Sequence, residues 1–171
     1  TGVWPPGRKK DIVGFRQARK NLIFCHRETF SCIKKKTPET QVGIAVNITY
    51  NEPYRPWFPP DRALVFLANI QGDYAFLERM QSHLDFIGLN YYFHSRLAFA
   101  FQPDTSFSAV KNENKIVSDF GWEVYPAGIA KVSWDLWQRF RKPIYITEHG
   151  VADANMIDKL RSDFIRQHLL Y

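Results

Sequence analysis

The sequence of 171 residues contains little cysteine and no long hydrophobic run. Its two cysteines, Cys25 and Cys32, lie on one expected helix, where their separation corresponds to roughly 10 Å along the axis. That distance is too long for a disulfide, so we expect two reduced thiols and a cytoplasmic protein. Neither a run of about 18 apolar residues nor a signal-peptide pattern is present, so we expect no membrane span and no membrane partner.

Glycine is scarce as well, at nine residues, and no glycine-rich phosphate loop follows an expected strand. The pattern Gly-x-Gly-x-x-Gly is absent, which leaves a dinucleotide-binding fold without support. We expect neither a cofactor nor a metal ion.

Acidic residues are outnumbered, 17 against 23 lysines and arginines, which gives a formal net charge of +6. The cations cluster at residues 8–10, 16–20 and 34–36. The last cluster closes a helical pattern, where cations complement the helix dipole. No base-reading motif accompanies the charge, so we expect no nucleic-acid partner.

Aromatic residues are plentiful, at 16% of the chain. This composition suits a cleft that binds a sugar or another ring, and it equally suits a large hydrophobic core. Both interpretations stay open on composition alone.

Hydrophobic periodicity places helices and short apolar strands in alternation along the chain. In order, we expect a helix over 13–36, a strand over 42–48, a proline-rich loop over 51–61, helices over 62–70 and 74–80, a strand over 84–91, a long loop over 93–120, a helix over 126–140, a strand over 144–147 and a helix over 157–170. The alternation indicates an α/β fold whose parallel strands are joined by helical crossovers. Three strands cannot close an eight-stranded barrel, so the sequence predicts either an open sheet or part of a barrel.

Residues 144–150, Ile-Tyr-Ile-Thr-Glu-His-Gly, are an apolar run that ends at a carboxylate. The carboxyl ends of buried parallel strands are where α/β barrels carry their chemistry. Glu148 is therefore the first candidate for a catalytic residue, with a salt bridge or a helix cap as the structural alternatives.

Four segments together resemble glycoside hydrolase family 1, the β-glucosidase family. They are the stretch 145–153 around Glu148, the segment 85–92 with Asn90 and Tyr92, the segment 120–128 that begins Phe-Gly-Trp-Glu, and the stretch from Trp-Pro-Pro-Gly at 4–7 to His26. The resemblance covers nearly the whole chain, in the family's order. It implies a partial (β/α)8 TIM barrel of about strands 5–7 with flanking helices, which residues 1–171 form as a single domain.

The same resemblance implies retaining hydrolysis of β-glycosides. Glu148 matches the nucleophile that attacks the anomeric carbon, and a second carboxylate about 5–5.5 Å away protonates the leaving oxygen. Tyr92 matches a residue that hydrogen-bonds the nucleophile and aims it. Asn90 matches a residue that lines the same substrate-binding subsite.

Three positions depart from this pattern. Asn51-Glu52-Pro53 has the composition of the family's acid/base tripeptide, but it follows the Pro-Pro-Gly segment that normally comes after the acid/base. We therefore expect Glu52 to be a loop carboxylate and the acid/base to precede Thr1. His149 replaces the usual Asn and either perturbs the nucleophile or points away into packing, and Phe93 stands where a small hydroxyl residue is common.

Two functions remain open. The first is a retaining β-glycosidase that hydrolyses terminal β-linked sugars of a glycoside or oligosaccharide. The second is a truncated or degenerate family member without hydrolysis, kept as a sugar-binding or structural protein. In either case, strands that end a partial barrel are open edges, so we expect self-association through them.

Overall fold

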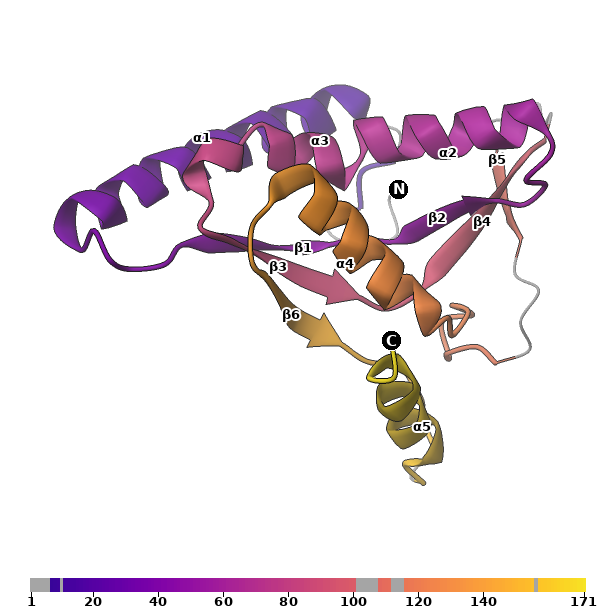
Figure 1. Cartoon of the computed structure of the whole chain (residues 1–171). Coiled ribbons are helices and arrows are strands. Elements are labelled where there is room, and N and C mark those ends of the chain that lie inside the picture. The colour runs from indigo at the N-terminus through magenta and orange to yellow at the C-terminus, as the bar shows by residue number, and fades with distance from the viewer. Residues whose placement is uncertain (1–6, 10, 101–107, 112–115, 156) are drawn as a thin grey trace.

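The computed structural model describes residues 7–9, 11–100, 108–111, 116–155 and 157–171. Figure 1 shows α1, α2 and α3 above the strands, α4 crossing in front of the sheet, and α5 beyond the end of β6. The helices are α1 (Ile12–Lys36), α2 (Pro59–Gln71), α3 (Asp73–Glu78), α4 (Ala127–Phe140) and α5 (Lys159–His168), with a short 3-10 helix at Gln81–His83. The strands are β1 (Gly43–Asn47), β2 (Tyr50–Pro53), β3 (Phe86–Tyr91), β4 (His94–Phe99), β5 (Ser108–Lys111) and β6 (Ile144–His149).

The three strands expected from the apolar runs form one sheet in the order β1-β3-β6. Both pairs of neighbours are parallel, as the alternation of helices and strands predicts. Their carboxyl ends therefore lie at one edge of the sheet, where Asn47 is opposite Asn90 and Asn90 is opposite Glu148.

The long helix α1 begins and ends where its sequence dictates. The Asp11 side chain caps the amino terminus by accepting a hydrogen bond from the Gly14 backbone N–H at 2.7 Å. Lys34, Lys35 and Lys36 occupy the last turn, and the helix stops before Pro38. Cys25 and Cys32 are exposed free thiols on this helix, which confirms that they form no disulfide with each other.

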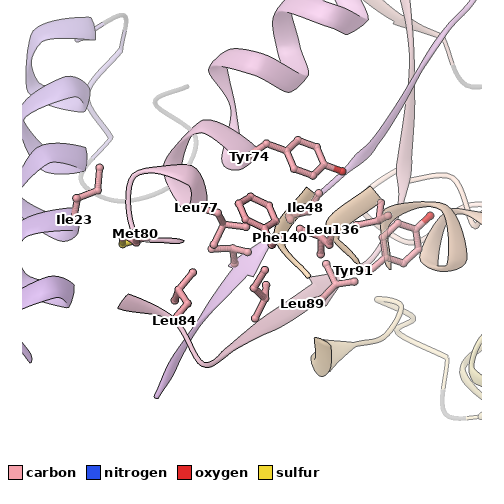
Figure 2. Packing of buried hydrophobic residues seen from close by; sticks show 13 residues of the cluster. Ile23, Ile48, Tyr74, Leu77, Met80, Leu84, Leu89, Tyr91, Leu136 and Phe140 are labelled. Carbon is pink, nitrogen blue, oxygen red and sulfur yellow. The ribbon is translucent and has the colours of Figure 1, made fainter. Parts of the chain in front are cut away.

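One hydrophobic core lies between the sheet and the helices (Figure 2). Leu89 from the central strand, Leu77 from α3 and Leu136 from α4 are each fully buried there. Tyr91 is buried too, and its hydroxyl donates to the Tyr125 carbonyl at 2.8 Å. The core includes only Ile23 from α1 as a buried residue, and this helix leaves several large apolar side chains exposed.

A second sheet, in the order β2-β4-β5, corrects two expectations from the sequence. The segment 51–61 is not a loop throughout, because β2 occupies its start and α2 begins at Pro59, with prolines in its first turn. The segment 93–120 holds β4 and β5, paired antiparallel, so the expectation of a long loop is wrong. The strand β4 buries His94 and Ser95, and polar residues in buried positions hide the alternation on which strand prediction depends.

Among the residues that the structure describes, each of the outer strands β1 and β6 of the first sheet pairs on one side only. On β6, Tyr145 is 58% exposed and Ile146 46% exposed, although the strand has the continuous apolar sequence of one covered on both faces. Self-association through these edges stays a prediction.

Candidate active site

Glu148 lies near the carboxyl end of β6 with its side chain exposed at the edge of the sheet. The register between β3 and β6 shifts by one residue after Leu89, because Leu89 is opposite Ile146 whereas Asn90 is opposite Glu148. Irregularities of this kind re-aim side chains at the ends of strands. The shift thus brings Asn90 and Glu148 side by side, as two of the predicted site residues require.

Tyr92 contacts Glu148 directly. Its hydroxyl donates a hydrogen bond to the Glu148 Oε2 atom. This bond, followed by burial and the charge of the carboxylate, raises the pKa of Tyr92 to about 12. The phenol therefore stays protonated and is a permanent donor to the carboxylate near neutral pH.

Asn90 is held by the neighbouring strand. The Thr147 hydroxyl donates to the Asn90 Oδ1 atom at 2.6 Å. The structure thus brings together Glu148, Tyr92 and Asn90, the three residues that the sequence predicts for the site. Their roles in catalysis and binding stay predictions.

His149 points away from Glu148 and into packing, which decides between the two alternatives left open by the sequence. Its ring centroid lies 4.7 Å from that of Phe164 and 4.5 Å from that of His168, both on α5. Burial, with a smaller contribution from His168, lowers the pKa of His149 to about 4. The imidazole is therefore neutral at pH 7 and places no charge beside the carboxylate.

This buried imidazole predicts a pH-dependent stability. In the unfolded chain His149 takes up a proton near pH 6.5, and in the folded chain only near pH 4, so protonation between these values favours unfolding. The contribution of His149 is complete above pH 6.5, and we expect about 2 kcal/mol of it to be lost as the pH falls to 4.

Urea unfolding followed by circular dichroism at several pH values measures this loss. The variant His149→Asn, which has the residue usual in the resembled family, should show a shallower decline than the wild type. Parallel declines in the two proteins would contradict the assignment. Carboxylates are present in both proteins, so the difference reports on the His149 imidazole together with its interaction with His168.

An apolar pocket of about 410 Å³ opens beside Tyr92. Its walls come from the end of β6 and from the segment before α4, and its lining is Tyr92, Ser118, Phe120, Trp122, Val124, Gly150, Val151 and Ala152. The Trp122 ring stacks on Phe93 with centroids 4.4 Å apart and contacts Phe120 at 5.1 Å. The sequence did not predict this wall, although the aromatic side chains at 120 and 122 were a usable signal.

Glu52 lies in β2, so the expectation of a loop carboxylate is wrong. Its Oε1 atom is 2.9 Å from Arg96 Nε and 3.3 Å from His94 Nε2, both on the neighbouring strand β4. The carboxylate is thus held in the second sheet, whereas Glu148 ends the first. In the part of the chain that the structure describes, no group of three or more His, Cys, Asp or Glu side chains could hold a metal ion.

Comparison with known proteins agrees with this geometry. The sequence profile of "Glycosyl hydrolase family 1" matches residues 65–171, more than half of the chain. The chain belongs to glycosyl hydrolase family 1. The fold is accordingly part of the TIM barrel of that family. The described residues of this chain do not form a closed barrel.

Individual relatives support the assignment. Beta-glucosidase A of Thermotoga maritima is 27% identical over 98% of this chain and 45% of its own length. The chloroplastic beta-glucosidase-like SFR2 of Oryza sativa subsp. japonica is 29% identical over 99% of this chain and 27% of its own length. This family 1 chain therefore spans less than half the length of both relatives.

Solved structures match over the whole chain as well. A beta-glycosidase from Pyrococcus horikoshii superposes with a TM-score of 0.84 and 29% identity, over 100% of this chain and 43% of that one. The family 1 b-glucosidase from Thermotoga maritima gives a TM-score of 0.80 and 25% identity, over 98% and 45% of the two chains.

Proposed function

We propose that this family 1 chain carries the nucleophile half of a retaining β-glycosidase, with Glu148 as the nucleophile. The observation that carries the proposal is the hydrogen bond from Tyr92 to Glu148, at the end of a barrel strand and beside an apolar pocket. The carboxylate attacks the anomeric carbon and forms a glycosyl ester as the bond to the leaving oxygen breaks. Tyr92 aims the attacking oxygen, and Asn90 contacts the sugar in the same subsite.

The aromatic pocket accepts the leaving group in this proposal. A pyranose bears a hydroxyl on most of its carbons, and burying those groups without partners costs about 1–3 kcal/mol each. The pocket walls carry few polar groups, among them the hydroxyls of Ser118 and Tyr92. A flat apolar ring on the leaving side is therefore a better match than a second sugar.

The acid/base of the proposed reaction lies outside residues 1–171. A leaving group of low pKa departs without protonation, so an activated glycoside needs only the nucleophile. This property allows Glu148 to be tested in the chain as it is.

The test is covalent labelling with 2,4-dinitrophenyl 2-deoxy-2-fluoro-β-glucoside. The Glu148 carboxylate should displace dinitrophenolate and retain one fluoroglucosyl group, which intact-mass spectrometry detects. Tryptic digestion should place the label in the peptide 142–159, where Glu148 is the one glutamate. Reversible sugar binding with no label would favour the alternative, a family member kept as a sugar-binding or structural protein.

Replacing Tyr92 by phenylalanine should slow this labelling. The substitution removes one hydrogen bond to a charged acceptor and keeps the ring, which corresponds to roughly 10- to 100-fold in rate. Release of dinitrophenolate, followed by its absorbance, measures the rate. A Tyr91→Phe variant is the matched control, because Tyr91 donates to a carbonyl in the core and not to Glu148. Equal labelling rates for Tyr92→Phe and the wild type would contradict the proposed role of the Tyr92 hydroxyl.

The last part of the proposal concerns where in the cell the protein is found. Among the described residues, no helix combines the length and the hydropathy needed to cross a bilayer. We also propose a cytoplasmic location, which the two free thiols support.

A further inference from the structure

A cluster of four ionisable side chains lies in the second sheet, outside the proposed catalytic residues. We name Glu52, His94, Arg96 and Glu123 the charge cluster. The Arg96 side chain lies between two carboxylates, with Nε 2.9 Å from Glu52 Oε1 and Nη1 donating to the two Glu123 oxygens at 2.8 and 2.6 Å. Glu123 is 4% exposed and the Arg96 side chain 17%, so this ion pair is largely removed from water.

His94 completes the cluster as a neutral ring. Its Nε2 atom is 3.3 Å from Glu52 and 3.8 Å from Glu123, and its side chain is fully buried. Burial is the largest influence and lowers its pKa, against the opposing pull of the carboxylates. Tyr125 covers the imidazole at a centroid distance of 3.9 Å. Tyr125 and the buried imidazole therefore cover one side of the ion pair between Arg96 and Glu123, while the side chains of Arg96 and Glu52 stay 17% and 21% exposed.

The cluster joins three segments that are distant in the sequence. Glu52 lies on β2, which follows β1, and Arg96 lies on β4, which follows β3. Glu123 belongs to the segment before α4 and forms an isolated antiparallel bridge with Val117. The ion pairs thus anchor this last segment to the second sheet.

Glu123 directly follows Trp122, the residue that forms the wall of the aromatic pocket. Neighbouring residues in extended backbone direct their side chains to opposite sides. Accordingly, Glu123 enters the charge cluster while Trp122 lines the pocket. The backbone from Ser118 to Trp122 forms a turn, in which the Ser118 N–H donates to the Trp122 carbonyl at 2.9 Å.

We propose that Arg96 and Glu123 are positioning residues for the pocket wall. By holding the Glu123 carboxylate, Arg96 sets the orientation of the Trp122 indole against a ring bound in the pocket. A buried ion pair is weak evidence for stability as such, because desolvation offsets the attraction, and its established use is to select one arrangement over others. The proposal rests on the proposed function for its choice of ligand.

The experiment compares a ligand that has an aromatic leaving group with a reagent that has none. The first is 4-nitrophenyl 1-thio-β-glucoside, which resists hydrolysis and whose nitrophenyl group quenches tryptophan fluorescence. The second is 2-deoxy-2-fluoro-β-glucosyl fluoride, which labels Glu148 with fluoride as the leaving group and so places no aromatic ring in the pocket. In Arg96→Met, which keeps the aliphatic stem, we expect the Kd of the thioglycoside to rise at least about tenfold, with labelling by the fluoride within about twofold of wild type.

A surface ion pair supplies the matched control. Arg139 Nη1 is 2.7 Å from Glu78 Oε1, and both side chains are largely exposed. Arg139→Met should leave the Kd within about twofold of wild type. A Kd unchanged in folded Arg96→Met would overturn the proposal, and so would equal losses in the two variants or equal losses of ring binding and labelling.

Two further measurements keep the test decisive. If Arg96→Met does not fold, the isosteric variant Glu123→Gln replaces it, with the same expected rise in Kd. Trp122→Leu should abolish the saturable quenching, because Trp57, Trp134 and Trp137, the other tryptophans that the structure describes, lie outside this pocket's lining. Absence of saturable quenching in the wild type would overturn the positioning proposal alone, since labelling of Glu148 by the fluoride reports separately on the proposed function.

Discussion

Replacing Glu148 by glutamine should abolish covalent labelling by the dinitrophenyl fluoroglucoside, with a loss in rate of at least about 1,000-fold. An amide has the shape of the carboxylate but is a very weak nucleophile, so it cannot form the glycosyl ester. The Tyr92 hydroxyl can still donate to the amide oxygen, so the site should keep its geometry. Intact-mass spectrometry after timed incubation measures the rate.

Glu39→Gln is the matched control for this variant. Glu39 is exposed in the segment between α1 and β1, on the amino-terminal side of the strand and away from the carboxyl edge that holds Glu148. It should label at the wild-type rate. Persistent labelling of Glu148→Gln would contradict the assignment of the nucleophile. A label found on the peptide that contains Glu52 would move the chemistry to the second sheet.

Replacing Asp61 by alanine should lower the free energy of unfolding by roughly 3 kcal/mol, the largest effect on stability that we expect. The Asp61 carboxylate is fully buried and accepts hydrogen bonds from Arg55 Nε and Nη2, each at 2.8 Å. It also accepts from the backbone N–H groups of Arg55 and Phe99. These donors, Arg55 first, lower the pKa of Asp61 to about 2.

Asp61→Ala should destabilise the fold because all the donors to the Asp61 carboxylate lose this acceptor together. Alanine removes the carboxylate acceptor of the Phe99 N–H and two of the hydrogen bonds of the Arg55 guanidinium, which keeps its bond to the Phe99 carbonyl. Partly buried donors that lose their acceptor lower the stability of the folded state. Since Asp61 is on α2 and Phe99 ends β4, the substitution also removes a hydrogen bond between the helix and the second sheet. Urea unfolding at pH 7, followed by far-ultraviolet circular dichroism, measures the change.

Asp163→Ala provides the comparison. Asp163 accepts from Lys159 at 2.6 Å and from Arg166 at 2.9 Å, but both pairs lie on the surface of α5. Surface pairs of this kind contribute little to stability, because water and salt screen them, so we expect a much smaller effect than for Asp61. Equal destabilisation by the two substitutions would show that the Asp61 contacts contribute no more than a surface pair.

The site was predictable in part because its residues sit at the ends of strands with strong local signatures. Ile144–Thr147 is an apolar run that ends at Glu148, and the segment with Asn90 and Tyr92 has the same character. Parallel pairing of such strands brings their carboxyl ends to one edge. The contact between Tyr92 and Glu148 follows from that pairing, whereas the one-residue shift that places Asn90 opposite Glu148 has no local signal.

The pocket wall could not be predicted in the same way. Trp122 lies in a segment without regular periodicity, and its place depends on a turn with Ser118 and on the ion pair between Arg96 and Glu123. The orientation of His149 likewise depends on rings from α5, which the residues around it in the sequence do not reveal.

The sequence by itself determined the alternation of helices and strands, the parallel first sheet and the family. These features depend on hydrophobic periodicity and helix ends, which are local properties of the chain. The tertiary structure alone decided the second sheet and the charge cluster. The strand β4 places His94 in the interior and Arg96 beside it, and these polar side chains are tolerated there because Glu52 and Glu123 reach them from other segments. A charged side chain can be buried only where an oppositely charged partner lies close to it in space. The sequence around the residue does not show whether such a partner is near.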